Sequence, residues 1–144
     1  MKESRPIQFQ HFIPGLIWWG FTLWLFTLPG SAVPAFPWLA KIHADKLVHL
    51  ALFAVWCFLF CWPFRKSALS DDRRQNWFLL IAITGIVYGI IIEFVQREMR
   101  QGRAFEINDV LADSIGCCLG YWGAIQFFLQ KKIGPDRNRD LNQN

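Results

Sequence analysis

The sequence lacks the features by which most soluble enzymes and nucleic-acid-binding proteins are identified. It contains no Rossmann, P-loop or zinc-finger pattern, no internal repeat and no low-complexity tract. The four cysteines lie inside apolar runs and not in loops with metal-ligand spacing, so we expect them to pack as small hydrophobic side chains. The net charge of +4 comes mostly from loops and tails, which is typical of membrane orientation signals. No nucleic-acid partner, cofactor or metal is therefore predicted.

What the sequence does have is a large share of apolar residues gathered in long runs. Hydrophobic residues make up 53% of the chain, which contains 8 Trp and 14 Phe. The runs are about 18–20 residues long, the length that a helix needs to cross about 30 Å of hydrocarbon. We predict an all-α integral membrane protein, with one domain over residues 1–130 that forms a four-helix bundle. The helices are expected at about 12–28, 45–62, 76–96 and 109–130.

The segments around these runs carry their own signals. The first run is longer and richer in Trp than the apolar part of a signal peptide, which favours a membrane helix. Residues 29–44 contain prolines and aromatic residues, and are predicted to lie on the membrane surface or to fold over a site as a lid. Residues 131–144 are predicted to form a disordered cytoplasmic tail. Asp45, Asn76 and Asp109 stand at three predicted helix starts, where each can cap its helix.

Lys and Arg are distributed unequally between the two sides of the predicted bundle. Ten of the 15 fall in the N-terminus, the 63–75 loop and the tail, and five fall on the opposite side. Because cytoplasmic loops carry the excess of Lys and Arg, both termini are predicted to be cytoplasmic. The chain is then a multi-pass protein of the bacterial inner membrane.

Ionisable and amide side chains recur at the outer ends of the second, third and fourth predicted helices. Consecutive spans alternate in direction, so these ends meet at one face of the bilayer. His49 and Asp113 each lie four residues inside their helices, about 6 Å at 1.5 Å per residue. Charged groups at membrane depth are costly and usually mark a site or a partner. The candidate site residues are Asp45, Lys46, His49, Glu93, Gln96, Arg103, Asp109 and Asp113.

Three of these residues are candidates for acid–base chemistry: His49, Glu93 and Asp109. An imidazole exchanges protons near neutral pH, although His49 could instead make a structural hydrogen bond. Glu93 could act as a base, or could pair with Arg97 at i+4. Asp109 could cap its helix, or could orient His49 or Arg103.

The other five are candidates for binding a substrate. Lys46 and Arg103 can bind phosphate or carboxylate oxygens, although Lys46 could snorkel toward headgroups and Arg103 could form an interhelical ion pair. Gln96 is expected to bridge polar groups, and Asp45 and Asp113 complete the set. Four carboxylates outnumber two cations, which a protonated histidine, a shared proton or a bound cation would balance. No compact ligand motif supports a metal ion.

The order and spacing of these residues resemble the VanZ-like family of small bacterial membrane proteins. The resemblance implies a four-helix integral membrane protein of the bacterial envelope, and the founding member is associated with low-level resistance to the glycopeptide antibiotic teicoplanin. It implies no established reaction. Such proteins often have Asn where this chain has Asp113. The matching residues are Asp45-Lys46-x-x-His49, Glu93-x-x-Gln96, Gly102-Arg103, Asp109 and Gly116-x-x-x-Gly120.

The residues leave three functional hypotheses open. In the leading one, a site in the outer leaflet binds an anionic lipid or a lipid-linked cell-wall precursor. A fuller form of this hypothesis adds that the site also transforms the bound molecule. In the second, the polar layer is an interhelical ion-pair network of a non-catalytic structural or adaptor protein. The third is a proton or ion carrier. The sequence disfavours it, because the third predicted helix has only Thr84 and Tyr88 as polar side chains between its start and Glu93. Neither enzymatic activity nor oligomeric state is fixed by these patterns.

Overall fold

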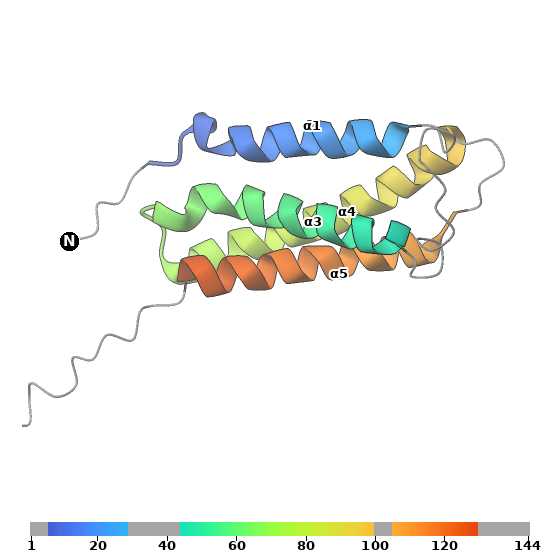
Figure 1. Ribbon diagram of the computed structural model, residues 1–144. Helices are drawn as coiled ribbons and strands as arrows, with labels where there is room; N and C mark the ends of the chain where they lie inside the picture. Colours follow the sequence, from blue (N-terminus) through green and yellow to red (C-terminus); the bar gives the residue numbers. More distant parts are fainter. Residues whose placement is uncertain (1–5, 29–43, 100–104, 130–144) are drawn as a thin grey trace, which may run out of the picture.

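The structure is a computed structural model, and it describes residues 6–28, 44–99 and 105–129. These residues form helices and no strand, which confirms the prediction of an all-α bundle of four helices (Figure 1). Residues 29–43 of the predicted surface segment at 29–44, residues 100–104 and the predicted tail lie outside the described residues, whereas Ala44 belongs to a helix. The elements are η1 (Phe9–Phe12), α1 (Ile13–Thr27), α3 (Ala44–Cys61), η3 (Trp62–Lys66), α4 (Asp71–Met99), α5 (Ile107–Ala124) and η4 (Ile125–Leu129).

Prolines mark positions at which α1 and α3 begin or end. Pro14 lies in the first turn of α1, where a missing N–H costs no helical hydrogen bond. At the other end of α1, Leu28 takes an extended conformation because it precedes Pro29, and the residue before a proline disfavours helical dihedrals. Pro63 follows the end of α3, and there the chain tightens from an α-helix into the 3-10 turn η3.

Two helices begin earlier than the apolar runs predict. α4 begins at Asp71 and not at Asn76, because Ser70 caps it: its hydroxyl and its carbonyl both accept backbone N–H groups from the first turn of α4. α5 begins at Ile107 with Glu106 at the N-cap position, so the predicted caps at Asn76 and Asp109 are wrong. Ser70 shows that a helix can extend into a polar segment when that segment supplies the cap.

The helices pack as a bundle in which α3, α4 and α5 contact one another and α1 lies along α3 and α4 (Figure 1). Glycines allow α5 to approach both α3 and α4 closely. A Cβ added at Gly120 of α5 would lie 2.5 Å from the carbonyl oxygen of Ala54 in α3. A Cβ added at Gly85 of α4 would lie 2.6 Å from Sγ of Cys117 in α5. Small residues of this kind are how membrane helices bring their backbones together.

α1 is joined to the rest of the bundle by a buried polar contact as well as by packing. The indole Nε1 of Trp18 donates a hydrogen bond to the carbonyl oxygen of Leu52 in α3, at 3.0 Å. Phe26, near the end of α1, is 3% exposed and packs against Phe53 and Ile92. The first helix is therefore an integral part of the core.

Two helical segments, Ala44–Lys66 and Asp71–Met99, are long and apolar enough to cross a membrane. α1 has 15 residues and is about 22 Å long at 1.5 Å per residue. One face of α4 exposes large apolar side chains over its length, which is uncommon on a soluble surface. The exposed residues on this face are Leu79, Leu80, Ile83, Val87, Ile91 and Phe94.

Candidate polar site at one end of the bundle

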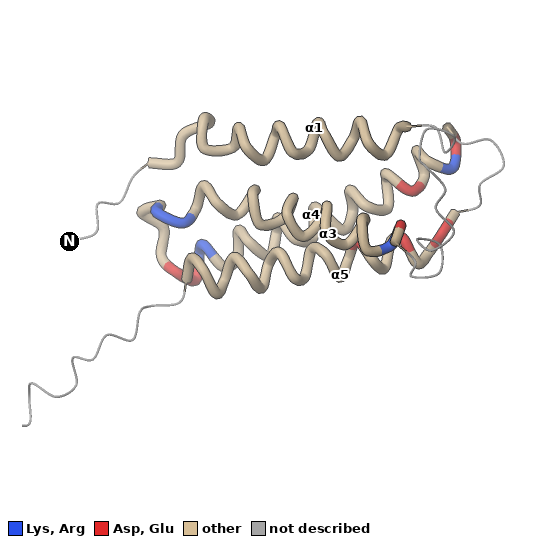
Figure 2. The backbone as a smooth tube through the Cα atoms, viewed as in Figure 1, with Lys and Arg blue, Asp and Glu red and all other residues tan. Residues whose placement is uncertain are grey.

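The charged residues of the described helices gather toward the two ends of the bundle, and the length between them carries none (Figure 2). The end that holds the predicted site lies opposite the end where η1 begins and η4 finishes (Figure 1). Arg103 lies outside the described residues, so its predicted role is not tested. The other predicted residues lie on three helices: Asp45, Lys46 and His49 on α3, Glu93 and Gln96 on α4, and Asp109 and Asp113 on α5.

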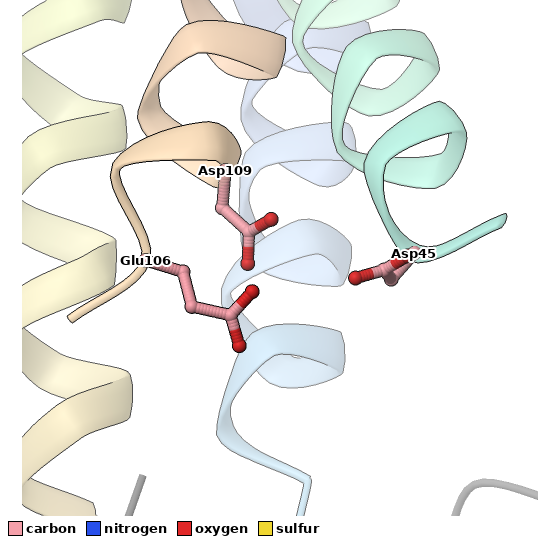
Figure 3. Close-up of side chains that lie close together, drawn as sticks. All are labelled: Asp45, Glu106 and Asp109. Atoms are coloured by element: carbon pink, nitrogen blue, oxygen red, sulfur yellow. The ribbon is translucent and has the colours of Figure 1, made fainter. Parts of the chain in front are cut away.

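The ammonium group of Lys46 is at the centre of the outer part of the site. Its Nζ lies 2.8 Å from Asp109, 3.1 Å from Asp45 and 3.2 Å from Glu106. Figure 3 shows the three carboxylates approaching a common space from the start of α3 and the start of α5. Glu106 is a residue that sequence reasoning missed, although an acid three positions before Asp109 shares its helical face. Asp45 lies within the first turn of α3.

The same three carboxylates have the spacing of a cation site. One oxygen from each of Asp45, Glu106 and Asp109 lies within 4.8 Å of the other two. Carboxylate oxygens are the ligands that Ca²⁺ and Mg²⁺ prefer. However, Lys46 donates a hydrogen bond to each of the three. The ammonium group of Lys46 therefore takes the place that a metal cation would have among the three carboxylates.

A second, deeper pair joins the same two helices. Nδ1 of His49 lies 3.0 Å from a carboxylate oxygen of Asp113, and the two residues are 8% and 1% exposed. Of the alternatives for Asp109, orienting His49 is wrong, because Asp113 occupies that place, and orienting Arg103 lies outside the described residues. A carboxylate at Nδ1 holds the proton on that nitrogen and leaves Nε2 as the atom available to a third group. The ring of Phe26 covers the imidazole, with 4.7 Å between centroids.

Gly89 of α4 packs against Asp113 and limits where its carboxylate can lie. A Cβ added at Gly89 would lie 2.7 Å from Oδ2 of Asp113, so only glycine fits there without moving the carboxylate. Gly89 therefore supports the His49–Asp113 pair without contributing a polar group of its own.

Glu93 and Gln96 use their side chains to hold backbone groups of other elements. The carboxylate of Glu93 accepts the backbone N–H of Glu106 at 2.7 Å, just before α5 begins. The ion pair with Arg97, one of the two alternatives predicted for Glu93, is not among the ion pairs of the described residues. Gln96 donates from Nε2 to the carbonyl oxygen of Phe26 at 3.2 Å, which joins α4 to α1. Both side chains are buried.

Exposure is graded across the site. The side chains of Asp45, Glu106 and Lys46 are 46%, 35% and 23% exposed, whereas those of His49 and Asp113 are 10% and 2% exposed. Lys46 and His49 are three positions apart on one face of α3. The arrangement therefore places an accessible cation one helical turn from a buried imidazole whose second nitrogen is unused within the described residues.

Comparison with known proteins gives one finding. The family model VanZ/LLP1 matches residues 6–129, which include every described helix. Neither curated proteins nor solved structures gave a match. The family and the two long apolar helices together indicate a membrane protein. With the match covering most of its length, the chain belongs to the VanZ-like (VanZ/LLP1) family.

Proposed function

We propose that the protein is a multi-pass component of the bacterial inner membrane, with both termini in the cytoplasm, whose polar site binds an anionic lipid or a lipid-linked cell-wall precursor at the outer leaflet. Membership of the VanZ-like family supports a role in the cell envelope. The start of η1 and the end of η4 lie at the same end of the bundle, as an even number of spans would require (Figure 1).

The spacing of charges along two helices supports placing the polar site in the headgroup layer of the outer leaflet. Lys46 and Arg65 are 19 positions apart on α3 and η3 with no Asp, Glu, Lys or Arg between them, and so are Arg74 and Glu93 on α4. At 1.5 Å per residue, 19 positions correspond to about 28 Å, close to the ~30 Å hydrocarbon thickness. Both ends of these helices would then reach the headgroup layers.

The observation that carries the proposal is the buried His49–Asp113 pair one turn from Lys46. An anionic headgroup would replace one carboxylate on the ammonium of Lys46, since phosphate and carboxylate oxygens make the same charge-assisted hydrogen bond. His49 would accept or donate a proton at Nε2, and Asp113 would hold the imidazole in the orientation that this requires.

Lipids retained by the purified protein test the binding step. We expect mass spectrometry to find a phosphate-bearing lipid on the wild-type protein, and less of it on the Lys46→Gln and Arg103→Ala variants. Arg97→Gln is the matched control, because Arg97 is an exposed cation of α4 that makes no ion pair within the described residues. Equal lipid retention by all four proteins would contradict the proposal.

A second function is favoured by a specific observation. The contacts of the site join different elements: α3 to α5 through Lys46 and His49, α4 to the start of α5 through Glu93, and α4 to α1 through Gln96. Such a network suits a non-catalytic structural or adaptor protein. Under this alternative, His49→Gln lowers any cellular phenotype only in proportion to the folded protein that remains. A phenotype lost with full folded yield would favour the lipid site.

A further inference from the structure

A small hollow lies at the opposite end of the bundle, between η1 and η3. It measures about 70 Å³, room for a small polar group but not for an acyl chain. Its walls come from the segment before α1 and from the turn after α3, which lie side by side at the end where η1 begins (Figure 1). The lining residues are Pro6, His11, Trp62, Pro63, Arg65 and Lys66.

Among the described residues, the hollow is lined by two cations, Arg65 and Lys66, and by no acid. Within the described residues, neither Arg65 nor Lys66 forms an ion pair. The neighbouring Arg74 differs, because its guanidinium is bound by Asp71 and by the carbonyl oxygens of Arg65 and Phe128. Within the part of the chain that the structure describes, these two positive charges are therefore available to an external anion.

His11, which also lines the hollow, adds a hydrogen-bond donor to this charge. Its Nδ1 accepts the backbone N–H of Gln8 at 3.2 Å, so the neutral ring carries its proton on Nε2. Nε2 has no partner within the described residues. The hollow thus offers a neutral N–H donor beside two cations, a combination that suits phosphate oxygens.

Aromatic side chains indicate at which level of the membrane the hollow lies. The guanidinium carbon of Arg65 lies 3.5 Å from the centroid of the Trp62 ring, a cation–π contact that holds the arginine in one orientation. Phe9, Trp62, Trp77 and Phe127 are all exposed on the elements at this end. Exposed aromatic residues are enriched at the headgroup level of membrane proteins.

We propose that this hollow binds a phosphate ester group, carried by an anionic phospholipid headgroup, through Arg65, Lys66 and the Nε2 of His11. Basic pockets near the cytoplasmic ends of membrane helices suit anionic headgroups, with each Lys or Arg near the surface worth about 1 kcal/mol, or about fivefold in affinity. The site is separate from the Lys46 cluster and rests on the proposed function only for its membrane orientation.

The test uses the full chain in a neutral detergent and measures binding of short-chain phosphatidylglycerol by native mass spectrometry. Phosphatidylcholine and inorganic phosphate are the comparison ligands. Lys66→Gln should weaken phosphatidylglycerol binding about fivefold, and Arg65→Gln with Lys66→Gln about 25-fold. Arg73→Gln is the matched control, since Arg73 is an exposed cation at the same end that does not line the hollow; we expect less than a twofold change.

Each outcome decides a different part of the proposal. If Arg73→Gln weakens binding as much as Lys66→Gln does, diffuse surface charge and not this hollow binds the lipid. If phosphatidylcholine binds as tightly as phosphatidylglycerol, the protein binds lipids without recognising an anionic headgroup. If inorganic phosphate binds as tightly as phosphatidylglycerol, the hollow is a phosphate site, but its ligand is not a lipid headgroup. If the double variant fails to fold, Arg65→Lys replaces it: the charge stays but the planar group above Trp62 is lost, and binding should still fall.

Discussion

The close approach of α3 and α5 predicts a large effect of one added methyl group. In Gly120→Ala, the new Cβ would lie 2.5 Å from the carbonyl oxygen of Ala54 and 2.8 Å from Cβ of Cys57. Ordinary contact begins near 3.4 Å, so the two helices must separate locally by about 0.9 Å. The clash is with backbone, which cannot rotate away as a side chain can.

The expected cost combines two terms. Overpacking a tight core typically costs about 1–3 kcal/mol, and alanine returns up to about 1 kcal/mol of helix propensity relative to glycine. We therefore expect Gly120→Ala to lower the free energy of unfolding by up to about 2 kcal/mol. Gly20→Ala is the control, because a Cβ added at Gly20 in α1 has no neighbour within 4 Å. That variant should be neutral or slightly more stable.

Unfolding in dodecyl maltoside micelles, driven by added SDS and followed by far-ultraviolet circular dichroism, measures both variants. The two glycines lie inside helices, so the difference between the variants isolates the contact with α3. If Gly120→Ala unfolds at the same SDS fraction as Gly20→Ala, α3 and α5 are not packed backbone to backbone. The explanation of how Lys46 and His49 reach α5 then fails.

Three other variants test the polar site. Lys46→Ala should leave three converging carboxylates with no central ammonium, so millimolar Ca²⁺ should raise its melting temperature but not that of the wild type; no Ca²⁺ effect on the variant would contradict the geometry. Asp113→Asn should cost about 1–2 kcal/mol and Asp113→Ala more, measured by SDS unfolding, since only alanine leaves the buried His49 without any partner; equal losses would argue against the pair. Glu93→Gln should stay within about 0.5 kcal/mol of wild type, because an amide oxygen still accepts the Glu106 N–H, whereas Glu93→Ala should lose about 1–3 kcal/mol. A Glu93→Gln protein that is stable but inactive in the cell would assign Glu93 a chemical role.

The helices were predictable because apolar runs of this length have one stable form in a membrane. Their limits were less predictable, since hydropathy does not report capping. Ser70 starts α4 inside a polar segment, five residues before the apolar run suggested. Leu28 and Pro63 show the reverse case, in which a proline in the sequence marks the change of backbone conformation directly.

The residues of the site were predictable from position, and their pairing was not. The i, i+4 spacing of Asp109 and Asp113 puts both on one face of α5, but which acid meets His49 depends on how far α5 slides along α3. Close contact at Gly116 and Gly120 sets that register, and it pairs Lys46 with Asp109 and His49 with Asp113. Glu106 was missed because it precedes the apolar run, where an acid reads as part of a solvated loop.

The two ends of the bundle should respond independently to mutation. Lys46 and Lys66 are on one continuous helical segment, 20 positions and about 30 Å apart at 1.5 Å per residue, well beyond the screening length of about 8–10 Å at moderate salt. No described charged residue lies between them on that segment except Arg65. A double-mutant cycle of Lys46→Gln and Lys66→Gln, measured by SDS unfolding, should therefore give a coupling energy below about 0.5 kcal/mol. A larger coupling would mean that α3 and η3 move as a two-state unit, so that binding at one end changes the shape of the other.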